Sequence, residues 1–105
     1  MNQETPDPVL VVAILTIRPG AADRFREFET RAARILARHG GSMERTVAVE
    51  DAQREVHLLR FPSQDAYAEY RADAELASLA ELRSESIAHT EILVGREGPR
   101  YTEEA

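Results

Sequence analysis

The chain has 105 residues and no cysteine, and its 13 basic and 19 acidic residues give a net charge of -6 at pH 7. This length fits one domain, and the lack of cysteine excludes a disulfide framework and thiolate catalysis. The basic residues are scattered among acids, which argues against a nucleic-acid or membrane partner. The first residues lack the positive flank of a signal peptide, and the apolar run 9–17 is too short to span a bilayer. We therefore expect a cytoplasmic protein.

The first third of the chain predicts a strand followed by a helix. Residues 1–8 are polar and contain two prolines, so we expect a mobile N-terminal segment there. In residues 9–17 both alternating sets are apolar, which predicts a strand that is covered on both faces. A helix over residues 21–38 follows, and Gly40 is suited to end it. Its apolar stripe comprises Phe25, Phe28, Ala32, Ile35 and Leu36.

Two further strands are expected in the middle of the chain. Residues 43–49 alternate, with Met43, Arg45 and Val47 on one face, which is typical of an edge strand. Residues 50–54 are polar and short enough for a hairpin loop. Residues 56–61 then form a short apolar strand, which Pro62 ends because it lacks a backbone donor.

The last third predicts helical structure and a final strand. Ser63 is a suitable N-cap for a helix that carries Tyr67 and Tyr70 at helical spacing. Residues 71–74 are expected to divide this region into two short helices. Residues 86–95 form the last strand, and residues 96–105 are a polar C-terminal tail.

This order of elements predicts an α+β fold, the ferredoxin-like βαββαβ arrangement, over residues 9–95. The two helical regions then cover only one face of an antiparallel sheet. The first strand is apolar on both faces, so a second copy of the chain is the simplest cover for the other face. We therefore expect a homodimer, a dimeric α/β barrel. The expected core residues are Phe25, Phe28, Ile35, Leu59, Phe61 and Ile92.

Several short motifs resemble a known family. They are His39-Gly40-Gly41 after the first helix, Phe61-Pro62-Ser63, the following Ala66 and Tyr70, Arg83, and Val94-Gly95 at the end of the last strand. With these motifs, residues 9–95 resemble the dimeric α/β-barrel family called domain of unknown function thirteen-thirty. More distantly, the chain is similar to the antibiotic-biosynthesis monooxygenase superfamily. The resemblance implies this fold and a dimer, and the superfamily's members work without a cofactor.

The chain has three histidines, and none has the spacing of a metal site, so we expect no metal ion. In the predicted topology the first strand is central and antiparallel to the third and fourth strands. Arg18 at its end should therefore lie near His57 and His89 at the start of the other two. If the three share a face, they predict a catalytic site in which a neutral histidine takes a proton and an arginine stabilises the anion. The alternative is that the side chains lie on opposite faces, since a one-residue slip turns a strand side chain over.

Three further residues are candidates for ligand binding. Tyr67 and Tyr70 are placed to line a cleft between helix and sheet, or else they are core residues with their hydroxyls at the rim. Arg83 is suited to bind a carboxylate or enolate, or else it pairs with Glu81, Glu85 or Glu69.

No phosphate-binding loop or nucleophile motif is present, so hydrolase and nucleotide-binding classes lack support. Two hypotheses follow. The protein binds a small organic molecule and acts on it as a cofactor-free enzyme, or it is a binding or structural module without catalysis. An enclosed pocket with convergent polar groups would favour the enzyme.

Overall fold

The computed structural model describes residues 7–102. The elements in chain order are β1 (Val9–Ile17), α1 (Ala22–Arg38), β2 (Ser42–Ala48), β3 (Arg54–Phe61), α2 (Gln64–Arg71), α3 (Ala74–Ala77), α4 (Ala80–Ser86) and β4 (Ile87–Gly95). The N-terminal segment expected to be mobile falls mostly on residues 1–6, outside the described range. Residues 7–8 and 96–102 are exposed and lack regular secondary structure. None of the helices in residues 7–102 has the length and apolarity that a bilayer crossing requires.

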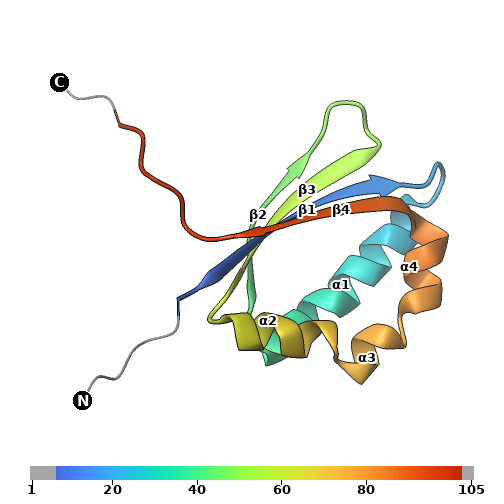
Figure 1. Ribbon diagram of the computed structural model, residues 1–105. Helices are drawn as coiled ribbons and strands as arrows, with labels where there is room; N and C mark the ends of the chain where they lie inside the picture. The colour runs from blue at the N-terminus through green and yellow to red at the C-terminus, as the bar shows by residue number, and fades with distance from the viewer. Residues whose placement is uncertain (1–6, 103–105) are drawn as a thin grey trace, which may run out of the picture.

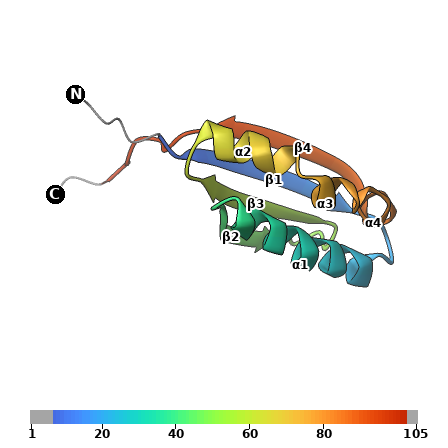
Figure 2. The ribbon, with the colours of Figure 1, turned by 90° about the horizontal axis from the view of Figure 1, so that it is seen from below.

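The four strands form one antiparallel sheet in the order β2-β3-β1-β4. All the helices lie on one face of this sheet (Figure 1). Seen from that side, α1 lies in front of β2 and β3, and the row α2 to α4 lies in front of β1 and β4 (Figure 2). The α+β, ferredoxin-like fold with a central β1 is therefore confirmed.

The two faces of β1 have different surroundings. Val9, Val11, Ala13 and Leu15 face the helices and are buried, whereas Leu10, Val12 and Ile14 on the opposite face are only half-buried. None of the helices in residues 7–102 lies on the opposite face. Both sets are apolar, as the sequence indicated, but one set remains partly open to solvent.

The end of α1 explains the two consecutive glycines. The Gly40 N–H donates to the Ala37 carbonyl and the Gly41 N–H to the Leu36 carbonyl, which is the Schellman pattern. Gly40 has φ of 76°, a conformation that costs other residues steric energy. A Cβ on Gly41 would collide with the Leu36 side chain and lie 3.1 Å from Phe61. The tight turn thus delivers β2 directly to the edge of the sheet.

The alternation expected for β2 is wrong in one respect. Its pairing with β3 is interrupted by a bulge between Met43 and Arg45. The extra residue turns the following side chains over, so Met43 shares the helix face with Leu59, whereas Arg45 and Val47 lie on the open face. The position of β2 at the edge is confirmed.

The connection from β3 to β4 begins as the sequence predicted. The Ser63 hydroxyl accepts from the Ala66 N–H at 3.1 Å and caps α2. The expected break follows at Ala72 and Asp73, where Asp73 caps α3. A second interruption at Ser78 and Leu79 produces three short helices rather than two.

Most of the predicted core is confirmed. Of the six residues expected there, Phe25, Phe28, Ile35, Leu59 and Phe61 are buried. Ile92 is the correction, because 46% of its surface is exposed. It lies on the helix face of β4, opposite Ala13, but β4 is an edge strand that has no strand neighbour beyond it within residues 7–102.

Candidate functional site

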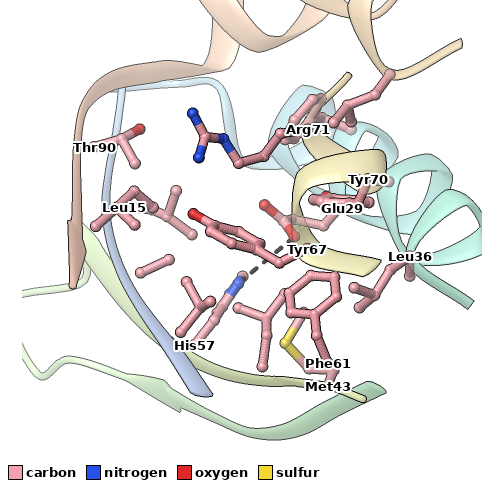
Figure 3. Close-up of a pocket in the computed structure, with 18 of the residues that line it drawn as sticks. Leu15, Glu29, Leu36, Met43, His57, Phe61, Tyr67, Tyr70, Arg71 and Thr90 are labelled. Carbon is pink, nitrogen blue, oxygen red and sulfur yellow. Dashed lines mark ion pairs between the residues drawn. The ribbon is translucent and has the colours of Figure 1, made fainter. Parts of the chain in front are cut away.

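A cavity of about 280 Å³ lies between the helix face of the sheet and the helices (Figure 3). Strands supply one wall because their inward positions recur every second residue, and α1 and α2 supply the other. Most of the lining is apolar, including Val11, Ala13, Leu15, Phe28, Leu36 and Phe61. A few polar side chains reach into this apolar space, which is the usual composition of a small-molecule site.

His57 is the buried polar residue of the sheet, with 3% of its surface exposed. It lies opposite Ala13 of β1 and therefore points toward α1. Its Nδ1 lies 3.6 Å from Oε1 of Glu29, the contact drawn dashed in Figure 3. Its Nε2 lies 2.9 Å from Oε1 of Glu55, which is two residues earlier on the same face of β3. Each ring nitrogen therefore faces a different carboxylate.

A second cavity of about 190 Å³ lies on the far side of this cluster. Glu55, Thr46 and Arg26 line the second cavity only, whereas Glu29 and His57 line both. The His57 side chain is thus part of the partition between the two spaces. The Glu55 side chain is 32% exposed, so one end of the cluster is in contact with solvent.

The electrostatic environment of Glu29 favours a bound proton. Burial raises the pKa of the Glu29 carboxyl above its ordinary value, His57 and Arg83 oppose this increase, and Glu55 adds to it. A carboxyl with a raised pKa is a stronger base once it is ionised. Glu29 is therefore suited to proton transfer.

The two tyrosines join the core and also line the cavity. The Tyr67 and Tyr70 rings lie 5.0 and 5.5 Å from the Phe61 ring, between centroids. The Tyr67 hydroxyl points into the cavity toward the side of Leu15 (Figure 3). Burial raises the pKa of Tyr70 to about 12, so this hydroxyl stays protonated at physiological pH. Both interpretations made from the sequence, core and cavity lining, thus apply to the same residues.

Arg83 also lines the cavity, and its Nη2 donates to the Thr90 hydroxyl at 2.8 Å. Within residues 7–102, no carboxylate lies within ion-pair distance of Arg83, and Glu85 pairs with Arg24 instead. The alternative prediction, a pair with a neighbouring glutamate, is therefore not found. The Arg71 guanidinium, on the same side of the cavity, lies 5.2 Å from the centre of the Tyr67 ring.

The structure does not bring Arg18, His57 and His89 together. His57 is opposite Ala13, whereas His89 is opposite Thr16, an odd number of residues along β1, so their side chains lie on opposite faces of the sheet. His89 is exposed on the open face. Arg18 donates from Nε to the Ser84 carbonyl at 2.8 Å beyond the end of β1. Of these three residues, only His57 lines the cavity.

Sequence reasoning missed Glu29 and Glu55, although signals for both exist. Glu29 lies four residues after Phe25 and three before Ala32, so the helical period places it within the apolar stripe of α1. Glu55 is two residues before His57, so the strand period places both on one face. Among residues 7–102, no group of three or more His, Asp and Glu side chains is arranged to hold a metal ion.

Comparison with known proteins finds solved structures that have a similar fold. No protein-family model matches the chain, and no curated protein matches its sequence. SnoaB, a cofactor-independent oxygenase from Streptomyces nogalater, has a similar structure with TM-score 0.75 and 20% identity over 92% of this chain and 99% of SnoaB. A candidate antibiotic biosynthesis monooxygenase from Bordetella bronchiseptica has TM-score 0.74 and 16% identity over 89% and 99% of the two chains. Another, from Nitrosomonas europaea, has TM-score 0.74 and 11% identity over 91% and 95%. These likenesses establish the fold.

Proposed function

We propose that the protein binds a small, mostly apolar organic compound in the main cavity and acts on it without a cofactor by removing a proton. One observation carries this proposal: Glu29 and His57 meet inside an apolar cavity that Arg83 also lines. The similarity to SnoaB and to the two candidate monooxygenases supports it. The relation to domain of unknown function thirteen-thirty and the cytoplasmic location remain predictions from the sequence.

The chemistry follows from the side chains. The carboxylate–histidine pair takes a proton from an acidic C–H group, and the Arg83 guanidinium stabilises the enolate that forms. In a mostly apolar cavity, such an enolate is electron-rich enough to react with molecular oxygen. A CH₂ group would then give a hydroperoxide, and loss of water from the hydroperoxide would leave a ketone. Both atoms of the oxygen molecule are accounted for, one in the ketone and one in the water.

The non-catalytic alternative also has an observation in its favour. Both ring nitrogens of His57 already face carboxylates, at 2.9 and 3.6 Å. A buried histidine that serves stability alone is held by partners in the same way. Binding of a ligand without turnover would favour this alternative.

We expect the partner of the open sheet face to be a second copy of the chain. Half-buried Leu10, Val12 and Ile14 lie on this face, together with Leu93, which is 53% exposed. Covering a few hundred Å² of apolar surface contributes several kcal/mol at roughly 25 cal/mol per Å². Sedimentation should give twice the 11.8 kDa mass of the chain. Leu93→Glu should shift the protein toward monomer, and a stable wild-type monomer at micromolar concentration would contradict the dimer.

The activity is tested with 2-tetralone, a bicyclic aromatic ketone that enolises readily. Proton NMR in D₂O follows exchange of its C1 hydrogens, and an oxygen electrode follows any oxidation. We expect saturable exchange above the buffer rate, slowed about 10²-fold by Arg83→Gln because the enolate loses its cationic partner. Arg31→Gln, which affects an ion pair with Glu27 on the outer side of α1, is the control. Saturable binding without exchange would favour the binding module, and no binding would contradict the proposal.

A further inference from the structure

His57 lacks a ring nitrogen directed freely into the main cavity. Its Nε2 is 2.9 Å from Glu55 and its Nδ1 is 3.6 Å from Glu29. A ligand in the main cavity therefore meets the Glu29 carboxylate, whereas the Glu55 carboxylate lies on the side of the second cavity. This arrangement gives the three residues different tasks.

The shorter contact sets the tautomer of His57. A carboxylate accepts hydrogen bonds but does not donate them, so we assign the 2.9 Å contact as an Nε2–H bond to the Glu55 carboxylate. In the neutral ring, Nδ1 then carries a lone pair directed at Glu29. The 3.6 Å separation is too long for a direct hydrogen bond, but contacts that move a proton often shorten only when the ligand binds.

We propose that Glu29 is the catalytic base of the main cavity, that His57 receives the proton from Glu29, and that Glu55 is a positioning residue that holds His57 in the required tautomer. This inference rests on the proposed function and assigns its proton transfer to particular atoms. The sequence alone instead predicts a histidine in the role of catalytic base.

The proton transfer balances within the cluster. A ligand C–H bond breaks, its electron pair stays on carbon as the enolate, and the proton goes to Glu29. Glu29 passes the proton to Nδ1 of His57, which becomes an imidazolium between two carboxylates. The same proton returns through Glu29 to the ligand carbon, or to an oxygen of the product. No proton is gained or lost over the cycle.

The surroundings support this division of tasks. Besides its two carboxylates, His57 packs 6.4 Å from the Phe25 ring, between centroids, which limits rotation of the imidazole. Arg83 and the Tyr67 and Tyr70 hydroxyls come from the helices that face Glu29 across the main cavity, and Arg26 reaches the second cavity from α1. Two cations, Arg71 and Arg83, line the main cavity. The Arg71 guanidinium lies 5.2 Å from the centre of the Tyr67 ring, so we assign Arg83 to the enolate.

The test uses two isosteric variants, Glu29→Gln and Glu55→Gln, with Glu27→Gln as the matched control. Glu27 is also on α1, but it pairs with Arg31 on the exposed side. With 2-tetralone as the probe, Glu29→Gln should slow C1 exchange by about 10²-fold or more while the probe still binds. Glu55→Gln should lower kcat about tenfold with KM unchanged, because it alters His57 rather than the ligand. Glu27→Gln should match the wild type.

A second readout does not depend on turnover. Nitrogen-15 NMR of the His57 ring should show the proton of the neutral ring on Nε2. Glu55→Gln should move the Nε2 resonance, Glu29→Gln should move the Nδ1 resonance, and Glu27→Gln should move neither. A proton on Nδ1, or an Nδ1 resonance that Glu29→Gln leaves in place, would overturn the inference.

The two proposals fail in different ways. A wild-type protein that binds 2-tetralone without exchanging its hydrogens contradicts the proposed activity, and the ring-nitrogen shifts then decide the proton arrangement on their own. An active wild type whose exchange survives Glu29→Gln overturns this inference and leaves the proposed function standing.

Discussion

His39 and His57 each face a carboxylate, one at the rim of the helical layer and the other inside the main cavity. At the rim, His39 Nε2 is 2.8 Å from Oδ2 of Asp73, and Arg38 donates to the same oxygen at 3.0 Å. Asp73 also accepts from the N–H groups of Glu75 and Leu76, which open α3. Inside the cavity, Glu29 approaches His57 only to 3.6 Å.

The two carboxyls respond to these surroundings in opposite directions. Hydrogen bonds from His39, and then from Arg38, hold the pKa of Asp73 well below its usual range. Burial holds the pKa of Glu29 above its usual range. At the rim, Asp73 binds His39 and Arg38 and so links the end of α1 to the start of α3; we call these contacts the clasp. Inside the main cavity, the other carboxyl–histidine pair, Glu29 and His57, is suited to proton transfer.

The largest expected effect on stability comes from Phe28→Ala, a substitution that also changes the burial of Glu29. Phe28 is buried and lines the main cavity one residue before Glu29. Phe28→Ala should lower the free energy of unfolding by about 3–5 kcal/mol, as measured by urea denaturation. It should also admit water and bring the pKa of Glu29 down toward its ordinary value. An unchanged free energy of unfolding would mean that α1 is wrongly placed on the sheet.

The next effect breaks the clasp at the rim. Asp73→Asn removes the charge that His39 and Arg38 bind, so the melting temperature at pH 7 should fall. Because the folded pKa of Asp73 is depressed, its contribution is present above the unfolded pKa and is lost as pH falls through the folded pKa. The difference from the wild type should therefore shrink in strong acid.

Asp23→Asn, in the exposed first turn of α1, is the control for this substitution. If Asp73→Asn melts at the same temperature as Asp23→Asn, the clasp does not contribute to stability.

Glu29→Gln should have a smaller effect on stability than Asp73→Asn, and of the opposite sign. Its folded pKa is raised, so the wild type loses stability as pH rises from the unfolded pKa through the folded pKa. Glu29→Gln cannot ionise and should not show this loss. Thermal melts from pH 4 to 8 should therefore show Glu29→Gln gaining stability relative to the wild type as pH rises. A relative loss over that range would indicate that ionised Glu29 is stabilised by His57 more than burial penalises it.

The smallest effect is expected at His89, on the open face of the sheet. His89→Ala should change the rate of 2-tetralone exchange by less than roughly twofold, because the side chain does not line the main cavity. His57→Ala should abolish most of the exchange. Equal losses in the two variants would restore the shared site that the sequence topology suggested.

The fold was predictable because its signals are local. The two-sided apolar strand 9–17, the stripe of α1 and the Pro62-Ser63 stop each depend on a few neighbouring residues. The topology then follows from their order. The bulge after Met43 was not predictable, because no turn residue marks it and it is defined only by pairing with β3.

The candidate site was predictable only in part, because the order of elements in the sequence does not determine strand register. Sequence topology placed both histidines near one end of β1, but only His89 lies there, opposite Thr16, whereas His57 lies opposite Ala13 at the middle of the strand. The face of each side chain also depends on register by a single residue. Helical spacing and charge singled out Tyr67, Tyr70 and Arg83, and all three line the cavity. Their role in ligand binding stays a prediction. Glu29 was missed although the helical period places it within the apolar stripe of α1, because glutamate is ordinarily a surface residue.

Carbon-13 NMR of the side-chain carboxyls, titrated in one sample, tests the central contrast most directly. We predict that the pKa of Glu29 lies above the ordinary glutamate value and that of Asp73 well below the ordinary aspartate value. Saturating 2-tetralone should move the Glu29 resonance and leave the Asp73 resonance in place. A Glu29 carboxyl that titrates at the ordinary value and ignores the ligand would contradict a proton-transfer site in this cavity.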